Sequence, residues 1–185
     1  AGQQTTYNIG NFLIETVSEL PDPPTKTGYT FTGWYTDPAC TKPYTEDKVI
    51  GNITLYAGFR ANTYTIVFNA NTGSGSMSNQ SMTYDTAANL TANAFTKTGY
   101  TFKGWATSAG GSIAYTNGQS VKNLSAEQGA TVNLYAVWEA NTYTITFNAN
   151  GGTGSMSNQS MTYDQSKALT ANAFTCLLYT SPSPR

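Results

Sequence analysis

The sequence contains no histidine and few charged side chains: Asp, Glu, Lys and Arg make up 10% of its 185 residues, against about a quarter of a typical globular chain. Without histidine, neither a Ser-His-Asp triad nor a Cys-His pair can be assembled. The two cysteines, Cys40 and Cys176, are too few for a disulfide framework and have no histidine to complete a zinc site. These shortages exclude the commonest nucleophilic centres and predict that the cysteines hold no metal.

Basic charge is also scarce. Nine Lys and Arg residues are scattered along a chain of net charge −1, so no basic patch is available for phosphates or for anionic lipids. No apolar run reaches the roughly 18 residues that a membrane span needs. The composition therefore predicts no nucleic-acid partner and no membrane insertion. Because the sequence opens on Ala1 without a signal-peptide pattern, we expect it to start inside a longer protein, with the signal and anchor outside it.

Aromatic and hydroxyl side chains are abundant instead. The sequence has 13 Tyr, 8 Phe and 3 Trp together with many Thr. These residues suit the pleated, half-buried surface of a strand better than a helix. The predicted fold class is β-dominated, α+β at most.

A long internal repeat sets the domain organisation. Residues 61–96 recur as 140–175, and the two stretches differ only at 67, 72, 74, 86, 87, 88 and 89. A more diverged copy lies at the front, where KTGYTFTGW at 26–34 matches KTGYTFKGW at 97–105. The predicted domains are a truncated repeat at 1–62, a complete repeat at 63–141, a truncated third repeat at 142–175, and a tail at 176–185.

The tail breaks the repeat abruptly. After Thr175 the repeat predicts KTGYTFKGW, but the sequence reads CLLYTSPSPR. A transposase-type sequencing adapter would encode this peptide. We therefore interpret 176–185 as a sequencing-adapter artefact and leave it out of the fold prediction.

Alternation of apolar and polar residues predicts the main strands. Tyr64, Ile66 and Phe68 share one face of an opening strand, and the Gly-rich stretch at 71–75 predicts the reversal of a hairpin. Alternate residues of 132–138 form the apolar face of a closing strand, which we place in the centre of the sheet.

The GYTFxGW motif recurs between the hairpin and the closing strand. The glycine before Trp34 and the glycine before Trp105 predict a bend or bulge that turns each indole into the core. The alternative is that these rings form a stacking platform for a sugar. A tryptophan that recurs once per repeat favours the core interpretation.

Together these motifs resemble a known family. A repeat that opens with YTITFNANGG, carries GYTFxGW in its middle and closes with a TLYAxW-like stretch is similar to the internalin-type B repeat, also called the Listeria-Bacteroides repeat. The resemblance covers residues 20–175. It implies a β-grasp-like mixed sheet, arranged head to tail, and an extracellular location on a bacterial cell surface. It implies no catalysis, no cofactor and no agreed ligand.

The acidic residues mostly occupy turn-like positions, which argues against a catalytic carboxylate pair. Asp85 and Asp164 each follow a tyrosine at equivalent positions, and we expect them to accept backbone N–H bonds in a turn or cap rather than to act as glycosidase-type acids. Glu46 and Asp47 lack the alternating oxygen ligands of a calcium loop. We predict no catalytic, cofactor-binding or metal-binding residue, and the ligand-binding residues are unknown.

Two functions are consistent with this sequence, and neither is enzymatic. The first is a structural spacer whose partners are the neighbouring repeats of the same chain, because Ala61-Asn62 and Ala140-Asn141 join predicted strands without a flexible linker. The second is an adhesion module in which each repeat weakly binds a host or cell-wall glycan or a protein, and multivalency sums the affinities. The loop at 108–122, which includes Tyr115 and is longer in the middle copy, is the candidate binding region.

Overall fold

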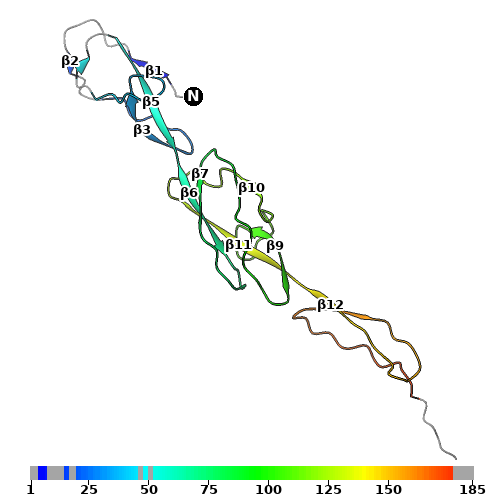
Figure 1. Cartoon of the computed structure of the whole chain (residues 1–185). Helices are drawn as coiled ribbons and strands as arrows, with labels where there is room; N and C mark the ends of the chain where they lie inside the picture. The colour runs from blue at the N-terminus through cyan, green and yellow to red at the C-terminus, as the bar shows by residue number, and fades with distance from the viewer. Residues whose placement is uncertain (1–3, 8–14, 17–19, 46–47, 50–51, 177–185) are drawn as a thin grey trace, which may run out of the picture.

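The computed structural model describes residues 4–7, 15–16, 20–45, 48–49 and 52–176. These residues form strands, turns and loops, with no helix among them. Three successive units lie end to end along an elongated molecule, which confirms the prediction of small β repeats in tandem (Figure 1). The Glu46-Asp47 pair and residues 177–185 of the tail lie outside the described residues.

The middle repeat contains a four-stranded mixed sheet in the order β7-β6-β11-β9. Its strands are β6 Thr63–Asn69, β7 Gln80–Thr83, β9 Tyr100–Ala106 and β11 Thr131–Ala140. The opening strand β6 runs parallel to β11, whereas β9 runs antiparallel to it. The closing strand β11 is therefore central, as predicted. A separate two-stranded ladder joins β8 Ala88–Asn89 to β10 Ser120–Val121.

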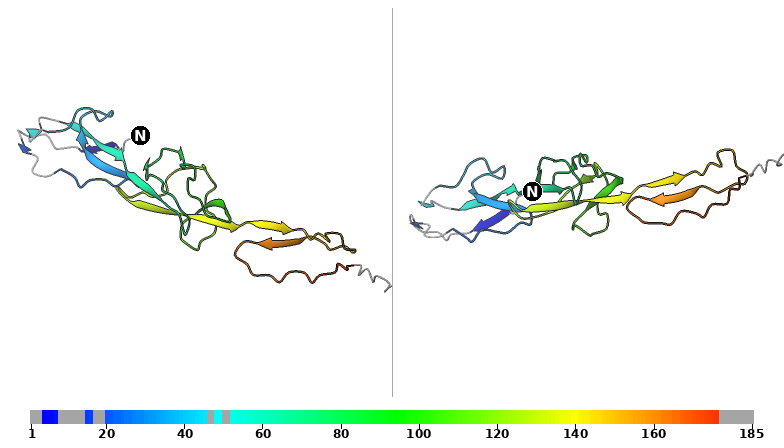
Figure 2. Two further views of the ribbon diagram at one scale, coloured as in Figure 1. Left: turned by 60° about the horizontal axis from the view of Figure 1, so that its bottom comes forward. Right: turned by 90° about the horizontal axis from the view of Figure 1, so that it is seen from below.

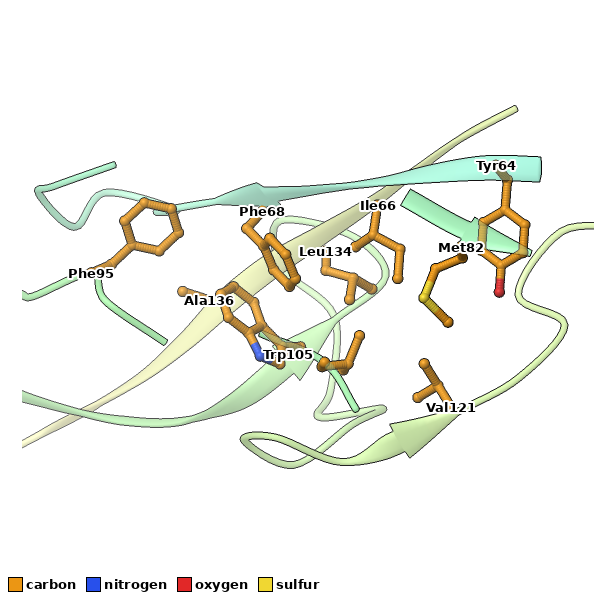
Figure 3. Close-up of a cluster of buried hydrophobic side chains, with 10 residues drawn as sticks. Tyr64, Ile66, Phe68, Met82, Phe95, Trp105, Val121, Leu134 and Ala136 are labelled. Atoms are coloured by element: carbon orange, nitrogen blue, oxygen red, sulfur yellow. The ribbon is translucent and has the colours of Figure 1, made fainter. Parts of the chain in front are cut away.

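Trp105 lies at the centre of the middle repeat's core and is 0% exposed. Figure 3 shows its indole between Phe68, Phe95 and the side chains of β11. The centroid of the indole lies 4.9 Å from the ring centroids of both Phe68 and Phe102. Such aromatic pairs add to the free energy gained from area burial. The core interpretation of this tryptophan is confirmed, and its ring cannot serve as an exposed platform.

The predicted alternation also holds along the strands. On β6 the side chains of Tyr64, Ile66 and Phe68 are buried, and the residues between them are half-buried. On β11 Leu134 and Ala136 are 0% exposed. Because β6 and β11 are hydrogen-bonded neighbours, their buried residues form one continuous apolar face of the sheet.

A β-bulge before Trp105 has a specific backbone cause. The register between β9 and β11 shifts at Val137/Trp138, so that Gly104 and Phe102 pair with consecutive residues and Lys103 is left out. Gly104 has a φ of 156°, and a Cβ there would lie 2.7 Å from a side-chain carbon of Ile113 and from the Tyr115 carbonyl oxygen. Only glycine fits this position.

The first repeat repeats this design around Trp34, Leu55 and Ala57, which are all buried. Its sheet has the order β1-β5-β3, built from β1 Gln4–Tyr7, β5 Ile53–Ala61 and β3 Tyr29–Tyr35. A short ladder pairs β2 Glu15–Thr16 with β4 Lys48–Val49.

The first and middle repeats differ in the strand that flanks the closing strand. The sequence TTYN at 5–8 matches MTYD at 82–85, which makes β1 the counterpart of β7. In the first repeat, however, β1 pairs directly and antiparallel with β5. Strand β1 therefore lies next to the closing strand of the first repeat. In the middle repeat the corresponding position is occupied by β6, which runs parallel to the closing strand.

The third unit is a hairpin of β12 Thr142–Ile145 and β13 Gln159–Thr162, paired antiparallel as β6 and β7 are. Its reversal carries positive φ angles at Asn150, Gly151 and Gly154, as the Gly-rich turn predicted. The division of the chain into independently folding units stays a prediction.

Candidate functional site

A single residue separates the sheets of adjacent repeats. Asn62 stands alone between β5, which ends at Ala61, and β6, which begins at Thr63. In the same way Asn141 stands between β11 and β12. The strands of neighbouring repeats therefore follow one another along nearly one line, as the two views of Figure 2 show. We call these two places the first and second junctions.

At the first junction Asn62 bonds to both repeats. Its backbone N–H donates to the Gly28 carbonyl at 2.9 Å in the first repeat, and its own carbonyl accepts from the Tyr84 N–H at 2.8 Å in the middle repeat. Its side-chain oxygen accepts a bond of 2.6 Å from the Thr30 hydroxyl, while its side-chain amide donates to the Ala126 carbonyl at 2.7 Å. Asn62 is 7% exposed, and these bonds satisfy its buried polar groups.

Two tyrosines close the first junction. The rings of Tyr29 and Tyr84 meet edge to face with centroids 5.9 Å apart, and the Tyr29 hydroxyl donates to Asp85 at 2.9 Å. Gly28, which has a φ of 77°, lies directly against the Tyr84 ring, where a Cβ would overlap the ring carbons. The glycine thus allows both the left-handed turn and the close approach of the next repeat.

The second junction repeats the two backbone bonds, the threonine bond and the tyrosine pair of the first, although Asn141 is exposed where Asn62 is buried. The Asn141 N–H donates to the Gly99 carbonyl at 2.8 Å, the Tyr163 N–H donates to the Asn141 carbonyl at 2.8 Å, and the Thr101 hydroxyl donates to the Asn141 side chain at 2.6 Å. The rings of Tyr100 and Tyr163 meet edge to face at 5.7 Å. Because equivalent bonds form at two places in one chain, the contact between neighbouring repeats is a specific interface.

Asp85 and Asp164 have a different role from the one predicted. Both adopt positive φ, at 60° and 57°, which confirms the turn. Their carboxylates, however, accept hydrogen bonds from the hydroxyls of Tyr29 and Tyr100 in the preceding repeat, at 2.9 and 3.1 Å. The predicted bonds came from backbone N–H groups instead. The prediction that they cap a turn through backbone bonds was wrong, because the neighbouring repeat supplies a hydroxyl donor within reach.

The first junction carries further polar contacts around Asp85. Asn123 donates its side-chain amide to the carboxylate at 2.9 Å, and the amino group of Lys122 lies 4.0 Å away. The bonds from Asn123 and Tyr29 lower the pKa of Asp85 below its ordinary value, because they favour the charged form. The same bond to Asp85 raises the pKa of the Tyr29 hydroxyl, and the bond to Asp164 raises that of Tyr100.

Sequence reasoning overlooked the junction although its residues were visible. Each Ala-Asn linker is preceded in its own repeat by the GYT of GYTFxGW and followed in the next repeat by a Tyr-Asp pair. This repeated combination could have predicted a contact between neighbouring repeats. The motif was assigned entirely to the interior of one repeat. In the structure Phe102 and Trp105 pack inside the repeat, whereas Gly99, Tyr100 and Thr101 contact the next one.

The predicted binding loop contributes to a shallow concavity. Tyr115 is half-buried against the core and pairs with Trp105, so it is not displayed as a platform. Residues 109–111 of the loop border a concavity of about 360 Å³ beside Lys97 and Trp138. The corresponding residues of the first repeat, 38–40, Lys26 and Phe59, border another concavity of about 420 Å³.

Within the described ranges, no three Asp, Glu, Cys or His side chains come together as metal ligands. None of the described segments forms an apolar helix of membrane-spanning length.

The family model of the Listeria-Bacteroides repeat domain matches residues 3–58, 64–137 and 143–175. The chain belongs to the Listeria-Bacteroides repeat family. This confirms the resemblance drawn from the sequence motifs. Each matched range contains one copy of the repeat, so the junctions join consecutive Listeria-Bacteroides repeats.

The chain is similar to parts of much longer proteins. It is 43% identical over 108 residues to Internalin H of Listeria monocytogenes, a match of 56% of this chain and 18% of that protein. It is 35% identical over 140 residues to a protein of Evansella cellulosilytica named "Putative Gly-rich membrane protein", a match of 71% of this chain and 15% of that protein. The chain thus spans less than a fifth of the length of these relatives. No solved structure matches it.

Proposed function

We propose that this chain is a non-catalytic spacer segment of a bacterial cell-surface protein, whose Listeria-Bacteroides repeats form a stiff stalk. The observation that carries the proposal is the junction built twice from the same bonds, around Asn62 and Asn141. The similarity to Internalin H and to the Gly-rich membrane protein supports the proposed surface location.

Stiffness follows from the number of constraints at each junction. A Gly/Ser linker would behave as a random coil, but here one residue joins two strands and its backbone bonds to both sides. The tyrosine pair and the Tyr–Asp bond add contacts displaced from the strand axis. Bending the chain would break contacts on one side of the junction, so each junction restricts the angle between repeats.

A linker insertion tests the spacer. Inserting Gly-Ser-Gly-Ser between Asn62 and Thr63 should separate the first and middle repeats without touching either core. The distribution of interatomic distances from small-angle X-ray scattering should then become broader, as is typical of flexibly linked domains. The matched control is the same insertion between Gly110 and Gly111, in an exposed loop of the middle repeat. If both variants and the parent chain give the same broad distribution, the stiff-stalk proposal is wrong.

A second candidate function is weak, multivalent glycan binding. The concavities of the first and middle repeats favour it, because each combines a lysine with an aromatic residue at equivalent positions: Lys26 with Phe59, and Lys97 with Trp138. Pockets that recur once per repeat suit binding summed by multivalency.

A glycan array probed with the full chain tests this second candidate. Binding that is lost in the double variant Lys26→Ala and Lys97→Ala, and retained when the exposed Lys103 is replaced by Ala, would support it. Absence of binding across the array, or equal binding by both variants, would leave the spacer as the function.

A further inference from the structure

The chain enters and leaves the middle repeat on two neighbouring parallel strands. It enters at Thr63, the first residue of β6, directly after the first junction. It leaves at Ala140, the last residue of β11, directly before the second junction. Five residue pairs, from Thr65↔Thr131 to Asn69↔Tyr135, join these strands in parallel register. The labels in Figure 1 let the reader follow this path from β5 through β6 and from β11 into β12.

Tension along the stalk would load this strand pair in shear. A pull toward the N-terminus acts on the beginning of β6, and a pull toward the C-terminus acts on the end of β11. In a parallel pair these are opposite ends of the ladder, so the force is directed along the strands and all five pairs share it. The strands must slide past each other before any large part of the repeat can extend.

We propose that the β6–β11 pair is a mechanical clamp that resists extension of each complete repeat under tension. This inference rests on the proposed stalk function, which supplies the tension, but its physical basis lies inside the repeat rather than at the junctions. A stalk can therefore be stiff without the clamp, and the clamp can exist in a flexible chain.

Contacts at the start of β6 extend the clamp beyond the ladder. The Gly129 N–H donates to the Thr63 carbonyl at 2.7 Å, and the Thr65 N–H donates to the Ala130 carbonyl at 2.8 Å. The Gln128 side chain accepts from the Thr63 N–H and donates to the Thr63 hydroxyl, both at 3.0 Å. These bonds tie the loaded end of β6 to the segment that leads into β11, so they must break together with the ladder.

Core packing opposes the same sliding motion. Ile66 and Phe68 on β6 and Leu134 and Ala136 on β11 belong to one buried cluster (Figure 3). Displacing one strand along the other by a residue would move these side chains out of their packed positions, because side chains alternate between the two faces of a sheet. The sheet therefore resists shear through side chains as well as through backbone bonds.

The first repeat provides an internal contrast. There β1 lies antiparallel to β5, with Gln4 opposite Tyr56 and Tyr7 opposite Ile53. A pull on the start of β1 and on the end of β5 acts at the same end of that ladder, so its bonds break one pair after another. We expect the first repeat to open at low force and the middle repeat at high force.

Single-molecule force spectroscopy on the full chain tests the clamp, with cysteine handles that choose the pulling direction. In a Cys40→Ser, Cys176→Ser background, handles at Thr63→Cys and Glu139→Cys pull the parallel pair in shear. Handles at Thr63→Cys and Thr131→Cys pull two residues at the same end of the pair and unzip it. All three handle positions are exposed, and Thr63→Cys is common to both variants.

The expected rupture force in shear is roughly twofold or more above that in unzipping at equal pulling speed, because forced unfolding reports the barrier along the pulled direction. Equal or lower force in shear would overturn the clamp. Urea unfolding of both variants controls for any difference in overall stability.

The chain attached only at its two ends gives a second readout that needs no cysteines inside the middle repeat. Pulled through its two ends, it should show one high-force event that releases the 63–140 segment, which at about 3.5 Å per residue corresponds to a contour length of roughly 270 Å. If that length is released at the same force as the first repeat, the clamp is absent. Neither result depends on the scattering experiment that tests stalk stiffness.

Discussion

The opening half of the middle repeat and the third unit have nearly the same sequence, yet only one of them is packed. Residues 61–96 and 140–175 differ at seven positions. Their local hydrogen bonds agree closely. In each, a glutamine side chain binds the backbone on both sides of a short segment: Gln80 contacts Asn89 and Thr91, and Gln159 contacts Ala168 and Thr170, at 2.7 to 2.9 Å.

Burial separates the two copies. Tyr64 is 1% exposed, whereas its counterpart Tyr143 is 50% exposed. The middle copy packs against β9 and β11, and residues 142–176 contain no counterpart of these strands. The comparison teaches that the hairpin's turns and polar bonds are specified locally, while the burial of its apolar face requires strands that lie later in the repeat.

The largest expected effect comes from removing the core of the middle repeat. Replacing Trp105 by Ala should lower the free energy of unfolding by about 3–5 kcal/mol, because it leaves a large cavity at a fully buried position. Urea denaturation followed by circular dichroism measures this loss. Where the middle repeat unfolds, Tyr64 should become as accessible as its counterpart Tyr143. The contrast between the two copies would then disappear.

Two control variants separate packing from other effects. The Trp105 indole N–H has no hydrogen-bond partner among the described residues, so Trp105→Phe loses volume but no bond and should cost only about 1–2 kcal/mol. Lys103→Ala removes an exposed ion pair with Glu139 and should change stability little. A Trp105→Ala variant as stable as the parent would contradict the core assignment.

The converse experiment supplies the third unit with its missing strands. Attaching a copy of residues 97–141 after Thr175 should give β12 and β13 the same partners that β6 and β7 have. Amide hydrogen exchange at residues 143–147 should slow by about a hundredfold or more, because these amides would then open only with the whole repeat. The protection of residues 64–68 provides the reference within the same sample.

The outcome in the unextended chain matters equally. We expect residues 143–147 to exchange much faster than 64–68 there. Equal, strong protection of both stretches would show that the hairpin is stable without a closing strand. It would also contradict the predicted boundary at 142 and the interpretation of 176–185 as an artefact.

A smaller effect is expected at the junctions, which both copies share. Gly28→Ala introduces a side chain at a φ of 77° and against the Tyr84 ring, so it should cost more than the roughly 1 kcal/mol of left-handed backbone strain alone. Gly118→Ala is the matched control, because Gly118 has a φ of 68° and no atom near its would-be Cβ. X-ray scattering should reveal a looser first junction only for Gly28→Ala; the same change in both variants would mean that the ring contact is unimportant.

The smallest expected effect is a pH dependence of the first junction. Because the pKa of Asp85 is lowered, its carboxylate stabilises the junction fully above the ordinary pKa of an aspartate, about 4. This stabilisation is lost as the pH falls through the lower folded value. Because the pKa of Tyr29 is raised, its protonated hydroxyl stabilises the junction below about pH 10. This stabilisation is lost as the pH rises through the higher folded value.

The angle between the first and middle repeats should therefore vary least at neutral pH. The measurement is the scattering profile of the full chain at acidic, neutral and alkaline pH. Asp85→Asn serves as the control, because it cannot titrate and should abolish the acid-side change at this junction. An unchanged acid response in Asp85→Asn would assign the effect to other groups.

Sequence alone determined the repeat, its strands and the faces of those strands. Period-two alternation identified Tyr64, Ile66 and Phe68 as inward-facing, and the glycine before Trp105 predicted the bulge, because these patterns follow from the geometry of one strand or one turn. The same local rules predicted a reversal at 71–75 and a turn at Asp85, and both places contain positive φ angles, at Asn71 and at Asp85.

The tertiary structure decided what no single segment encodes. The parallel pairing of β6 with β11 joins residues far apart in the chain. The Tyr29–Asp85 bond joins two different repeats. A carboxylate in a turn can accept a bond from its own backbone or from any donor that packing brings within reach. Which donor reaches Asp85 depends on how the first repeat packs against the middle repeat, and that arrangement rests on the bonds of Asn62 together with the contact between Tyr29 and Tyr84.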